Sequence, residues 1–262
     1  MSSLQAKDSQ TPPALTRKQM EIRRRERKIL HLARPMVAEG GLAGISMEAI
    51  AKEMEYAKGT IYNHFSCKEE ILLALAIAAN EKRLELFQAA TERQESTRDK
   101  ISGIGVACED FRERFADLFK IDVMVRHSTV WEKASEKRRE AMAECEQRCM
   151  TMVAAVGYQA LEKGDLVLNA PTRVEDMMFG LWSLTYGGMI IDDSSPGLDH
   201  VGIRNSFTAI RRNCHALMDG YAWRPLYDIE RDRKLVRNTR SYLKRRVKDD
   251  FLTSDDLHQS TD

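Results

Sequence analysis

The stretch KGTIYNHF, residues 58–65, decides the fold of this chain. Its two large apolar residues, Ile61 and Phe65, are four positions apart and therefore share one face of a helix, while the polar residues between them point elsewhere. An apolar stripe of helical spacing precedes the stretch behind Ser46, a good N-cap residue. A longer one follows it from residue 68. This order of short helix, tight break, short helix and long helix predicts a helix-turn-helix with its supporting helices.

Capping-box patterns predict where three helices begin. In such a box, Ser or Thr and a Glu or Gln three residues later satisfy each other's backbone N–H groups. Residues 16–19, 66–69 and 172–175 match this pattern or its close variant. The first helix should run to Gly40-Gly41. A kink is expected inside it at Pro35, because proline removes one backbone hydrogen bond.

The rest of the chain is also predicted to be helical. Two amphipathic segments span roughly residues 98–131 and 133–163, and another helix carries its apolar stripe over residues 207–221. Residues 177–191 are apolar nearly all round, so this helix must be covered on both sides. No strand alternation of useful length is present. We therefore expect an all-α fold.

The composition agrees with this fold class. The 262 residues include only 14 Gly and 6 Pro, and many are of types that lose little rotamer freedom in a helix. The 5 cysteines are scattered without metal-binding spacing. No apolar run reaches the roughly 18 residues of a membrane span, and the N-terminus lacks the apolar core of a signal peptide. These features predict a cytoplasmic protein that does not enter a membrane.

Charge is distributed unevenly although the formal net charge is only +1. Residues 17–34 carry +6, residues 35–203 carry −9, residues 204–248 carry +9 and residues 249–262 carry −5. Clustered Lys and Arg at the start of the chain suit a polyanion partner such as DNA. A solvated basic helix face explains the same charges equally well, so charge alone does not decide between them.

The residues around the helix-turn-helix resemble the DNA-binding head of the TetR family, the tetracycline-repressor-like bacterial regulators. The likeness covers roughly residues 24–75 and rests on Ile50-Ala51-Lys52, on the 58–65 stretch and on Lys68-Glu69. One departure lies in the turn, where Glu55 occupies roughly the place of a small residue. The implied architecture is a three-helix DNA-binding head with a larger helical domain for ligand binding and dimerisation.

The resemblance also implies how DNA is bound. A homodimer would place its two heads in successive major grooves of a palindromic operator, about 34 Å apart. The expected DNA-binding residues are Ser46, Lys58, Gly59, Thr60, Tyr62, Asn63, His64 and Lys68. Of these, Thr60, Asn63 and His64 are expected to face the groove and the others to meet phosphate. The chemistry agrees, because Asn can pair with the edge of adenine and hydroxyls and amines suit phosphate.

Members of this family usually hold a small-molecule pocket in the larger domain. Candidate lining residues are Phe111, Phe115, Met124, His127, Trp131 and Trp182. Ordinary helical core explains the same residues as well. The expected ligand is small and apolar or amphipathic, because methionine-rich walls adapt to apolar molecules.

These inferences divide the chain into four parts. We expect an arm over residues 1–15, the helix-turn-helix domain over 16–70, the ligand-binding and dimerisation domain over 71–222, and a basic helix with an acidic tail over 223–262. The basic helix could pack on the acidic body, bind a second subunit or touch DNA. Packing on the body is the simplest of the three.

The predicted function is transcriptional regulation, with a repressor released from its operator by a ligand. The alternative is a DNA-binding protein without an inducer, controlled by a protein partner or acting as an activator. A filled C-terminal core would favour that alternative. Neither an enzyme nor a cofactor is expected, because no phosphate-binding loop, nucleophile motif or metal-ligand spacing is present in the sequence.

Overall fold

The computed structural model describes residues 16–126, 128–195 and 197–249. Within these ranges the regular elements are helices and none is a strand, so the predicted all-α fold is confirmed. In chain order the helices are α1 (Arg17–Gly44), α2 (Met47–Glu53), α3 (Lys58–His64), α4 (Lys68–Thr91), α5 (Thr97–Arg114), α6 (Ala116–Val125), α7 (Ser128–Lys133), α8 (Glu136–Lys163), α9 (Val174–Ser194), η1 (Asp199–Val201), α10 (Ser206–Gly220) and α11 (Ile229–Arg246). The expected arm over residues 1–15 and the tail from residue 250 lie outside the described residues.

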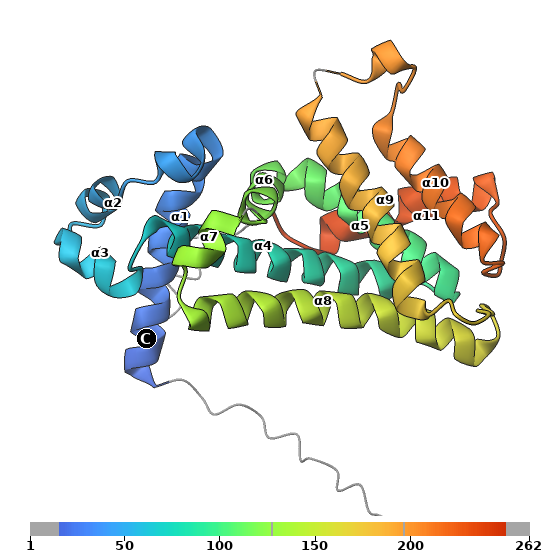
Figure 1. Ribbon diagram of the computed structural model, residues 1–262, viewed down its shortest axis with the longest axis horizontal. Helices are drawn as coiled ribbons and strands as arrows, with labels where there is room; N and C mark the ends of the chain where they lie inside the picture. The colour runs from blue at the N-terminus through green and yellow to red at the C-terminus, as the bar shows by residue number, and fades with distance from the viewer. Residues whose placement is uncertain (1–15, 127, 196, 250–262) are drawn as a thin grey trace, which may run out of the picture.

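The helices form a small head and a larger body in an elongated molecule (Figure 1). Helices α1, α2 and α3 make the head at one end, and α5 to α11 make the body. Helix α4 belongs to both, since it packs against α1 in the head and against α5, α6 and α8 in the body. It is buried on nearly every side, as a central helix must be. Among the described residues, no helix is both long enough and apolar enough to cross a membrane.

Helices α1 and α2 begin at the N-cap residues that the sequence predicts. The Thr16 hydroxyl accepts the N–H of Gln19 at 3.3 Å, and the Gln19 side chain accepts the N–H of Thr16 at 2.9 Å. This capping box is therefore confirmed. The Ser46 hydroxyl accepts the N–H of Ala49 at 3.1 Å and begins α2, as expected.

The other two predicted capping boxes are wrong by one residue. Cys67 is the N-cap of α4 and makes no side-chain cap hydrogen bond. The Glu69 carboxylate, needed for the box, instead pairs with Lys133 of α7 at 3.0 Å. At α9 the N-cap is Arg173, whose N–H donates to the Asp176 carboxylate at 2.9 Å. A contact from outside the helix thus replaces the local bond in α4.

The break in α1 lies at Gly41 rather than at Pro35. Pro35 keeps helical dihedral angles, and only Gly41 departs from them, with φ of 59° and ψ of −154°. Glycine adopts this φ with little strain because it has no Cβ. The chain therefore turns at the predicted glycine stop and completes one more helical turn by Gly44.

The segment expected over residues 98–131 is three helices, α5, α6 and α7, rather than one. The first break falls at the buried Phe115, where φ of −126° and ψ of 47° leave the helical region. Because of this turn, α6 packs across both α4 and α1. It therefore becomes a link between the body and the head.

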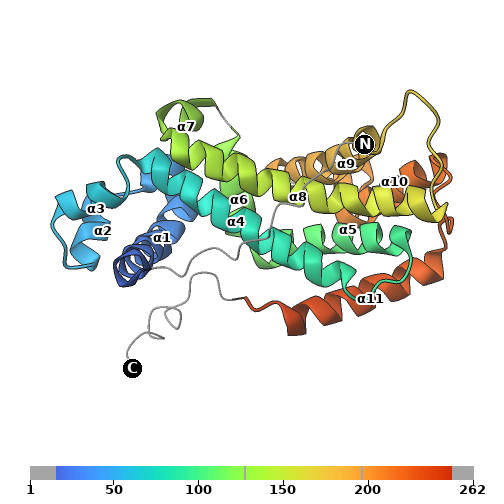
Figure 2. The same cartoon turned by 90° about the horizontal axis from the view of Figure 1, so that it is seen from below.

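The basic C-terminal helix, α11, packs along α5 and α4 on the side of the body away from α8 (Figure 2). The Arg240 guanidinium lies 2.9 Å from Glu109 and 2.8 Å from Glu113, both on α5. Leu243 is fully buried beneath the helix. Packing on the acidic body, the simplest of the three expected placements, is the one observed.

Candidate DNA-binding surface and ligand cavity

The recognition stretch forms α3, and its two faces differ as the sequence spacing predicts. Ile61 and Phe65 are both 0% exposed and anchor the helix in the core of the head. Gly59 and Asn63 are exposed, and Tyr62 keeps 43% of its surface accessible. A Cβ built on Gly59 would meet nothing within 4 Å, so the helix backbone itself is open to a partner there.

The turn before α3 is held partly by α1. Glu55 has a φ of 57°, a left-handed conformation that costs a residue with a Cβ roughly 1–2 kcal/mol. The next residue, Tyr56, donates its N–H to the carbonyl of Ala51 at 2.9 Å. The guanidinium of Arg25 lies 5.9 Å from the centre of the Tyr56 ring. The small residue expected at the turn is therefore replaced by a strained one supported from α1.

Some predicted DNA-binding residues already have protein partners. The Lys58 ammonium donates to the Glu48 carboxylate, and this bond raises the pKa of Lys58 and lowers that of Glu48. The Lys68 ammonium donates to the carbonyl of Ala43 at 3.3 Å. Ser46 serves as the N-cap of α2 and stays half-buried beside the exposed face.

His64 and Thr60 are less exposed than Tyr62 and Asn63. Only 10% of the His64 side chain is accessible, and its Nδ1 lies 3.9 Å from the Glu26 carboxylate of α1. Thr60 is half-buried. The open face of α3 thus consists of Lys58, Gly59, Tyr62 and Asn63, with His64 turned toward α1.

The N-terminal turns of α1 project beyond α2 and α3 (Figure 1). Arg17, Lys18 and Arg23 are exposed there. Arg24 and Arg25 pair with Glu21 within the helix, at 3.9 and 3.0 Å. This basic ridge lies beside the recognition helix, and the +6 charge of residues 17–34 is the sequence signal for it.

The body contains a cavity of about 190 Å³, with walls from α4, α5, α6, α8, α9 and α10. Two of the candidate lining residues, Phe111 and Trp182, lie in its wall. Phe115, Met124 and Trp131 are packed outside that lining. His127 lies outside the described residues.

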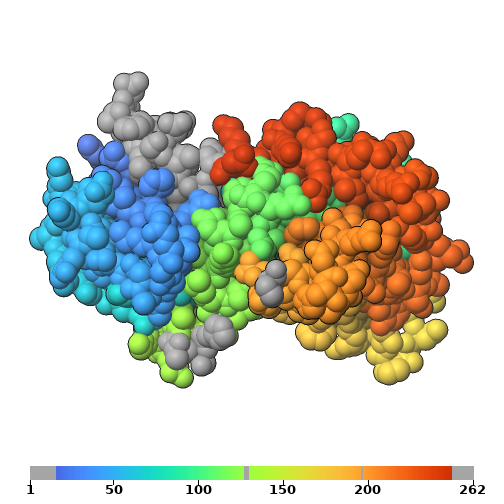
Figure 3. All heavy atoms as spheres, turned by 90° about the horizontal axis from the view of Figure 1, so that it is seen from above, coloured from blue at the N-terminus to red at the C-terminus, as the bar shows by residue number. Residues whose placement is uncertain are grey.

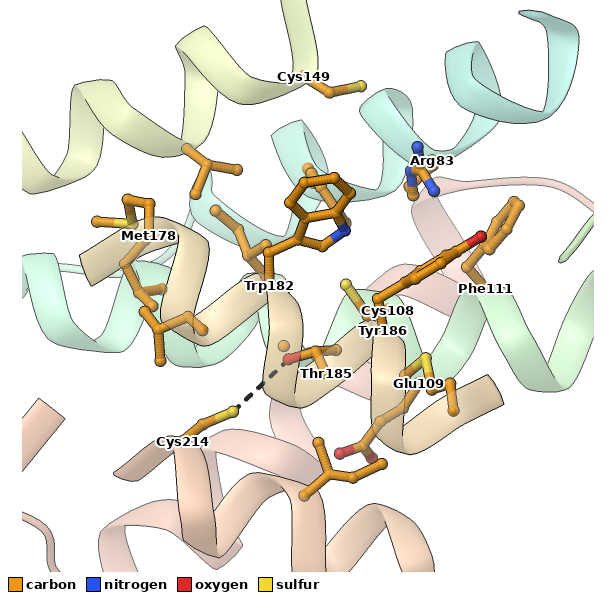
Figure 4. Close-up of a pocket in the computed structure, with 18 of the residues that line it drawn as sticks. Arg83, Cys108, Glu109, Phe111, Cys149, Met178, Trp182, Thr185, Tyr186 and Cys214 are labelled. Atoms are coloured by element: carbon orange, nitrogen blue, oxygen red, sulfur yellow. Dashed lines mark hydrogen bonds between the residues drawn. The ribbon is translucent and has the colours of Figure 1, made fainter. Parts of the chain in front are cut away.

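The cavity wall is mostly apolar and rich in sulfur. Trp182 and Tyr186 project from α9 toward Arg83 of α4, and Cys108 and Cys149 approach from α5 and α8 (Figure 4). Burial raises the pKa of the Cys108 thiol to about 12, so this thiol is protonated and uncharged at neutral pH. All 5 cysteines are free, and no cluster within the described residues could hold a metal ion.

Charged groups in and behind the cavity wall are paired. Arg83 lies 3.2 Å from Asp122, whose side chain is 1% exposed. Arg211 lies 2.5 Å from Glu109, whose side chain is 3% exposed. Burial raises the pKa of Glu109, although the nearby arginines oppose this shift. Sequence spacing missed these pairs because every one of them joins different helices.

Two polar links join the head to the body, and neither is visible as a sequence motif. Arg34 of α1 makes a two-bond contact with Asp117 of α6, one bond measuring 3.0 Å. Glu70 of α4 accepts the N–H of Ser135 and pairs with Arg138 at 3.3 Å. The Arg138 guanidinium also lies 5.2 Å from the centre of the Phe65 ring, at the end of α3. Both α1 and the end of α3 are therefore in contact with helices of the body.

Comparison with known proteins finds a family match in the part of the chain that contains α2, α3 and the parts of α1 and α4 next to them. The sequence model of the family described as bacterial regulatory proteins, tetR family, matches residues 29–75. The HTH-type transcriptional regulator UidR of Escherichia coli K12 is 34% identical over 74 residues, which is 28% of this chain and 38% of UidR. The chain thus matches less than two fifths of the length of this curated relative.

Solved structures extend the likeness to the fold of the body. The TetR-family regulator PfmR of Thermus thermophilus aligns over 73% of this chain and 97% of its own, with a TM-score of 0.54 and 17% identity. The fatty acid degradation regulator FadR of Bacillus halodurans aligns over 76% of this chain and 97% of its own, with a TM-score of 0.56 and 16% identity. Identities this low show the fold alone. Over residues 29–75 the chain is therefore similar to the bacterial regulatory proteins of the tetR family, and the larger part of it shares the fold of solved regulators of that family.

Proposed function

We propose that this protein is a transcriptional regulator that binds operator DNA through α3. The observation that carries the proposal is the open face of this helix, where Tyr62 and Asn63 are exposed while Ile61 and Phe65 hold the opposite face in the core. Asn can read a base edge, and the tyrosine hydroxyl suits a phosphate oxygen. Lys58 can exchange Glu48 for phosphate when DNA is bound.

The functional unit we propose is a homodimer on a palindromic site. Helix α9 packs against α10, α8 and α5. Phe179 and Ile191 remain 60% and 56% exposed, and the helix packs closely on α10 through Gly188 and Ile210. Helices α9 and α10 together form an open face of the body (Figure 3). A second copy would cover this apolar face, as the sequence of α9 requires.

Release by a small molecule is the regulation we propose. The cavity lies between α4, which starts in the head, and the helices of the proposed dimer face. A ligand that binds better to one spacing of the two heads shifts the population toward it and weakens or strengthens DNA binding accordingly. The alternative without an inducer predicts a filled core, and the observed cavity favours the ligand.

The test is a gel-shift titration on DNA from upstream of the protein's own coding sequence, at two salt concentrations and against scrambled competitor. Sequence-specific binding with a footprint of two half-sites about one helical turn apart supports the proposal. Binding indifferent to sequence at both salt concentrations contradicts it.

Variants of α3 separate phosphate contacts from base reading. Tyr62→Phe should weaken binding to every sequence but leave the salt slope unchanged, because the lost hydroxyl is uncharged and only cationic side chains release counterions from phosphate. Asn63→Ala should instead change which sequences bind. Tyr158→Phe is the matched control, because this tyrosine is 51% exposed and lies on α8 in the body. Parent-like binding by both α3 variants would show that the recognition helix is wrongly assigned.

A further inference from the structure

Three arginines line the apolar cavity, and they differ in how their charge is balanced. Arg83 pairs with Asp122, and Arg211 pairs with Glu109. Both carboxylates are almost completely buried. Each of these two arginines therefore has a buried carboxylate as a close partner, although Glu109 also pairs with Arg240 at 2.9 Å. The third arginine, Arg126, has no buried carboxylate of its own.

Arg126 is held in place by contacts that leave its charge weakly compensated. Its Nε donates to the Tyr186 hydroxyl at 2.9 Å, and its guanidinium lies 4.8 Å from the centre of the Tyr186 ring and 5.5 Å from that of Trp182. The nearest carboxylate is Glu146 at 3.4 Å, with a side chain that is 34% exposed. Asp122 is 3.8 Å away and is already bonded to Arg83. The partner of Arg126 is thus a carboxylate at the solvent side of the cavity.

We propose that the cavity binds an apolar organic carboxylate whose anionic group replaces Glu146 on Arg126. The apolar part of the molecule would lie among Trp182, Phe119 and Met178, which line the same cavity. This inference rests on the proposed function, in which the cavity holds the regulatory ligand. It names the chemical class of that ligand.

The energetics favour an anion over a cation. When a ligand carboxylate arrives, Glu146 returns to water at little cost, because its side chain is already partly exposed. The new pair gains strength, because Arg126 is already oriented and the surroundings are apolar. Burial raises the pKa of Tyr186 to about 12, so its hydroxyl remains protonated and can also donate to an anion. A cationic ligand would be repelled by Arg126, which already occupies the aromatic faces of Trp182 and Tyr186 that could otherwise bind a cation.

The experiment compares three probes that share a naphthyl body and carry an anionic, a neutral or a cationic head group: 2-naphthoate, 2-naphthamide and 2-naphthylmethylammonium. Their affinities for the full-length protein are measured by isothermal titration calorimetry. We expect naphthoate to bind at least tenfold more tightly than the ammonium compound, as for a charge-assisted hydrogen bond. Glu146→Gln should strengthen naphthoate binding severalfold and leave naphthamide binding unchanged, because the competing carboxylate is removed.

The controls keep the inference separate from folding and from DNA binding. Arg126→Gln should lose the preference for naphthoate while still binding naphthamide, which shows that the cavity is intact. Arg148→Gln is the matched control, because Arg148 lies on α8, the same helix as Glu146, but does not line the cavity. Its side chain is 50% exposed and pairs with Glu81 of α4, so this variant should bind the probes like the parent.

The outcomes are distinct from those of the DNA-binding test. Equal affinity for the three probes, a preference that survives Arg126→Gln, or no naphthoate binding at millimolar concentration overturns the carboxylate assignment. If the parent still shifts its DNA in these cases, the proposed function stands. If the protein fails to bind DNA but still prefers naphthoate, the proposed function is overturned and the carboxylate assignment stands.

Discussion

Glu55 adopts a φ of 57° in the turn of the helix-turn-helix, where the resemblance predicts a small residue. Replacing it by glycine removes a strain of roughly 1–2 kcal/mol but adds flexibility to the unfolded chain. We expect Glu55→Gly to raise the free energy of unfolding by about 0.5–1 kcal/mol, measured by urea denaturation. Glu55→Ala keeps the Cβ and should bring no such gain. Equal effects of the two substitutions would contradict the strain explanation.

Asp122 is the buried partner of Arg83, and removing its negative charge should lower the stability of the folded protein. Asp122→Asn leaves the Arg83 guanidinium buried without a compensating charge. Breaking a buried pair in this way typically costs about 3–5 kcal/mol, so a clear fall in thermal stability is expected. Glu146→Gln is the matched control, because that carboxylate is partly exposed and should change stability by less than about 1 kcal/mol. Comparable losses in both variants would refute the distinction.

At the scale of the element, the projecting turns of α1 should contribute to DNA binding without reading sequence. Lys18 and Arg23 are exposed on this ridge, beside the recognition helix. The double variant Lys18→Gln, Arg23→Gln should lower the salt slope of binding by up to about 0.9 for each phosphate that is no longer neutralised, with the preferred sequence unchanged. Arg233→Gln with Lys234→Gln, on the exposed side of α11, is the control. If the salt slope of DNA binding is unchanged in the α1 double variant, Lys18 and Arg23 do not contact phosphate.

At the scale of the whole molecule, assembly should depend on the apolar face of α9. Phe179→Asp places a charge where we expect a second copy to pack, so it should give monomers at micromolar concentration in analytical ultracentrifugation. Its DNA affinity should fall with it, because two linked heads bind far better than one. Val167→Asp, at a site that is 69% exposed before α9, should leave the assembly unchanged. A dimer that persists in Phe179→Asp would place the interface elsewhere.

The link between head and body has a pH dependence of predictable sign. Burial tends to raise the pKa of Asp117, but the bonds and charge of Arg34 outweigh it and the net pKa is below 3.8. As the pH falls below about 4, the unfolded chain therefore takes up the proton first. The stabilisation that the Asp117–Arg34 pair gives to the folded protein is fully present above this pH range. It is lost as the pH falls through the lowered pKa that Asp117 has in the folded protein. Thermal unfolding between pH 5 and 3 should show a shallower pH dependence in Asp117→Asn than in the parent, and equal slopes would contradict this.

Patterns confined to a few neighbouring residues were predictable from the sequence. Thr16 and Ser46 begin their helices as expected, because an N-cap bond reaches only three residues along the chain. The core positions Ile61 and Phe65 also follow from helical spacing. Glu69 shows the limit of this reasoning, since its pairing with Lys133 displaces the predicted capping box.

The sequence by itself therefore determined the all-α class, the helix-turn-helix and the resemblance of residues 24–75 to the TetR family, because these follow from local periodicity and from one distinctive string of residues. Only the tertiary structure decided that His64 turns to Glu26, that Phe111 and Trp182 but not Phe115 line the cavity, and that Arg126 has no buried carboxylate of its own. Each of these depends on contacts between helices distant in the chain. Such contacts are set by how whole helices pack, and helical spacing alone carries no information about which neighbour a side chain meets.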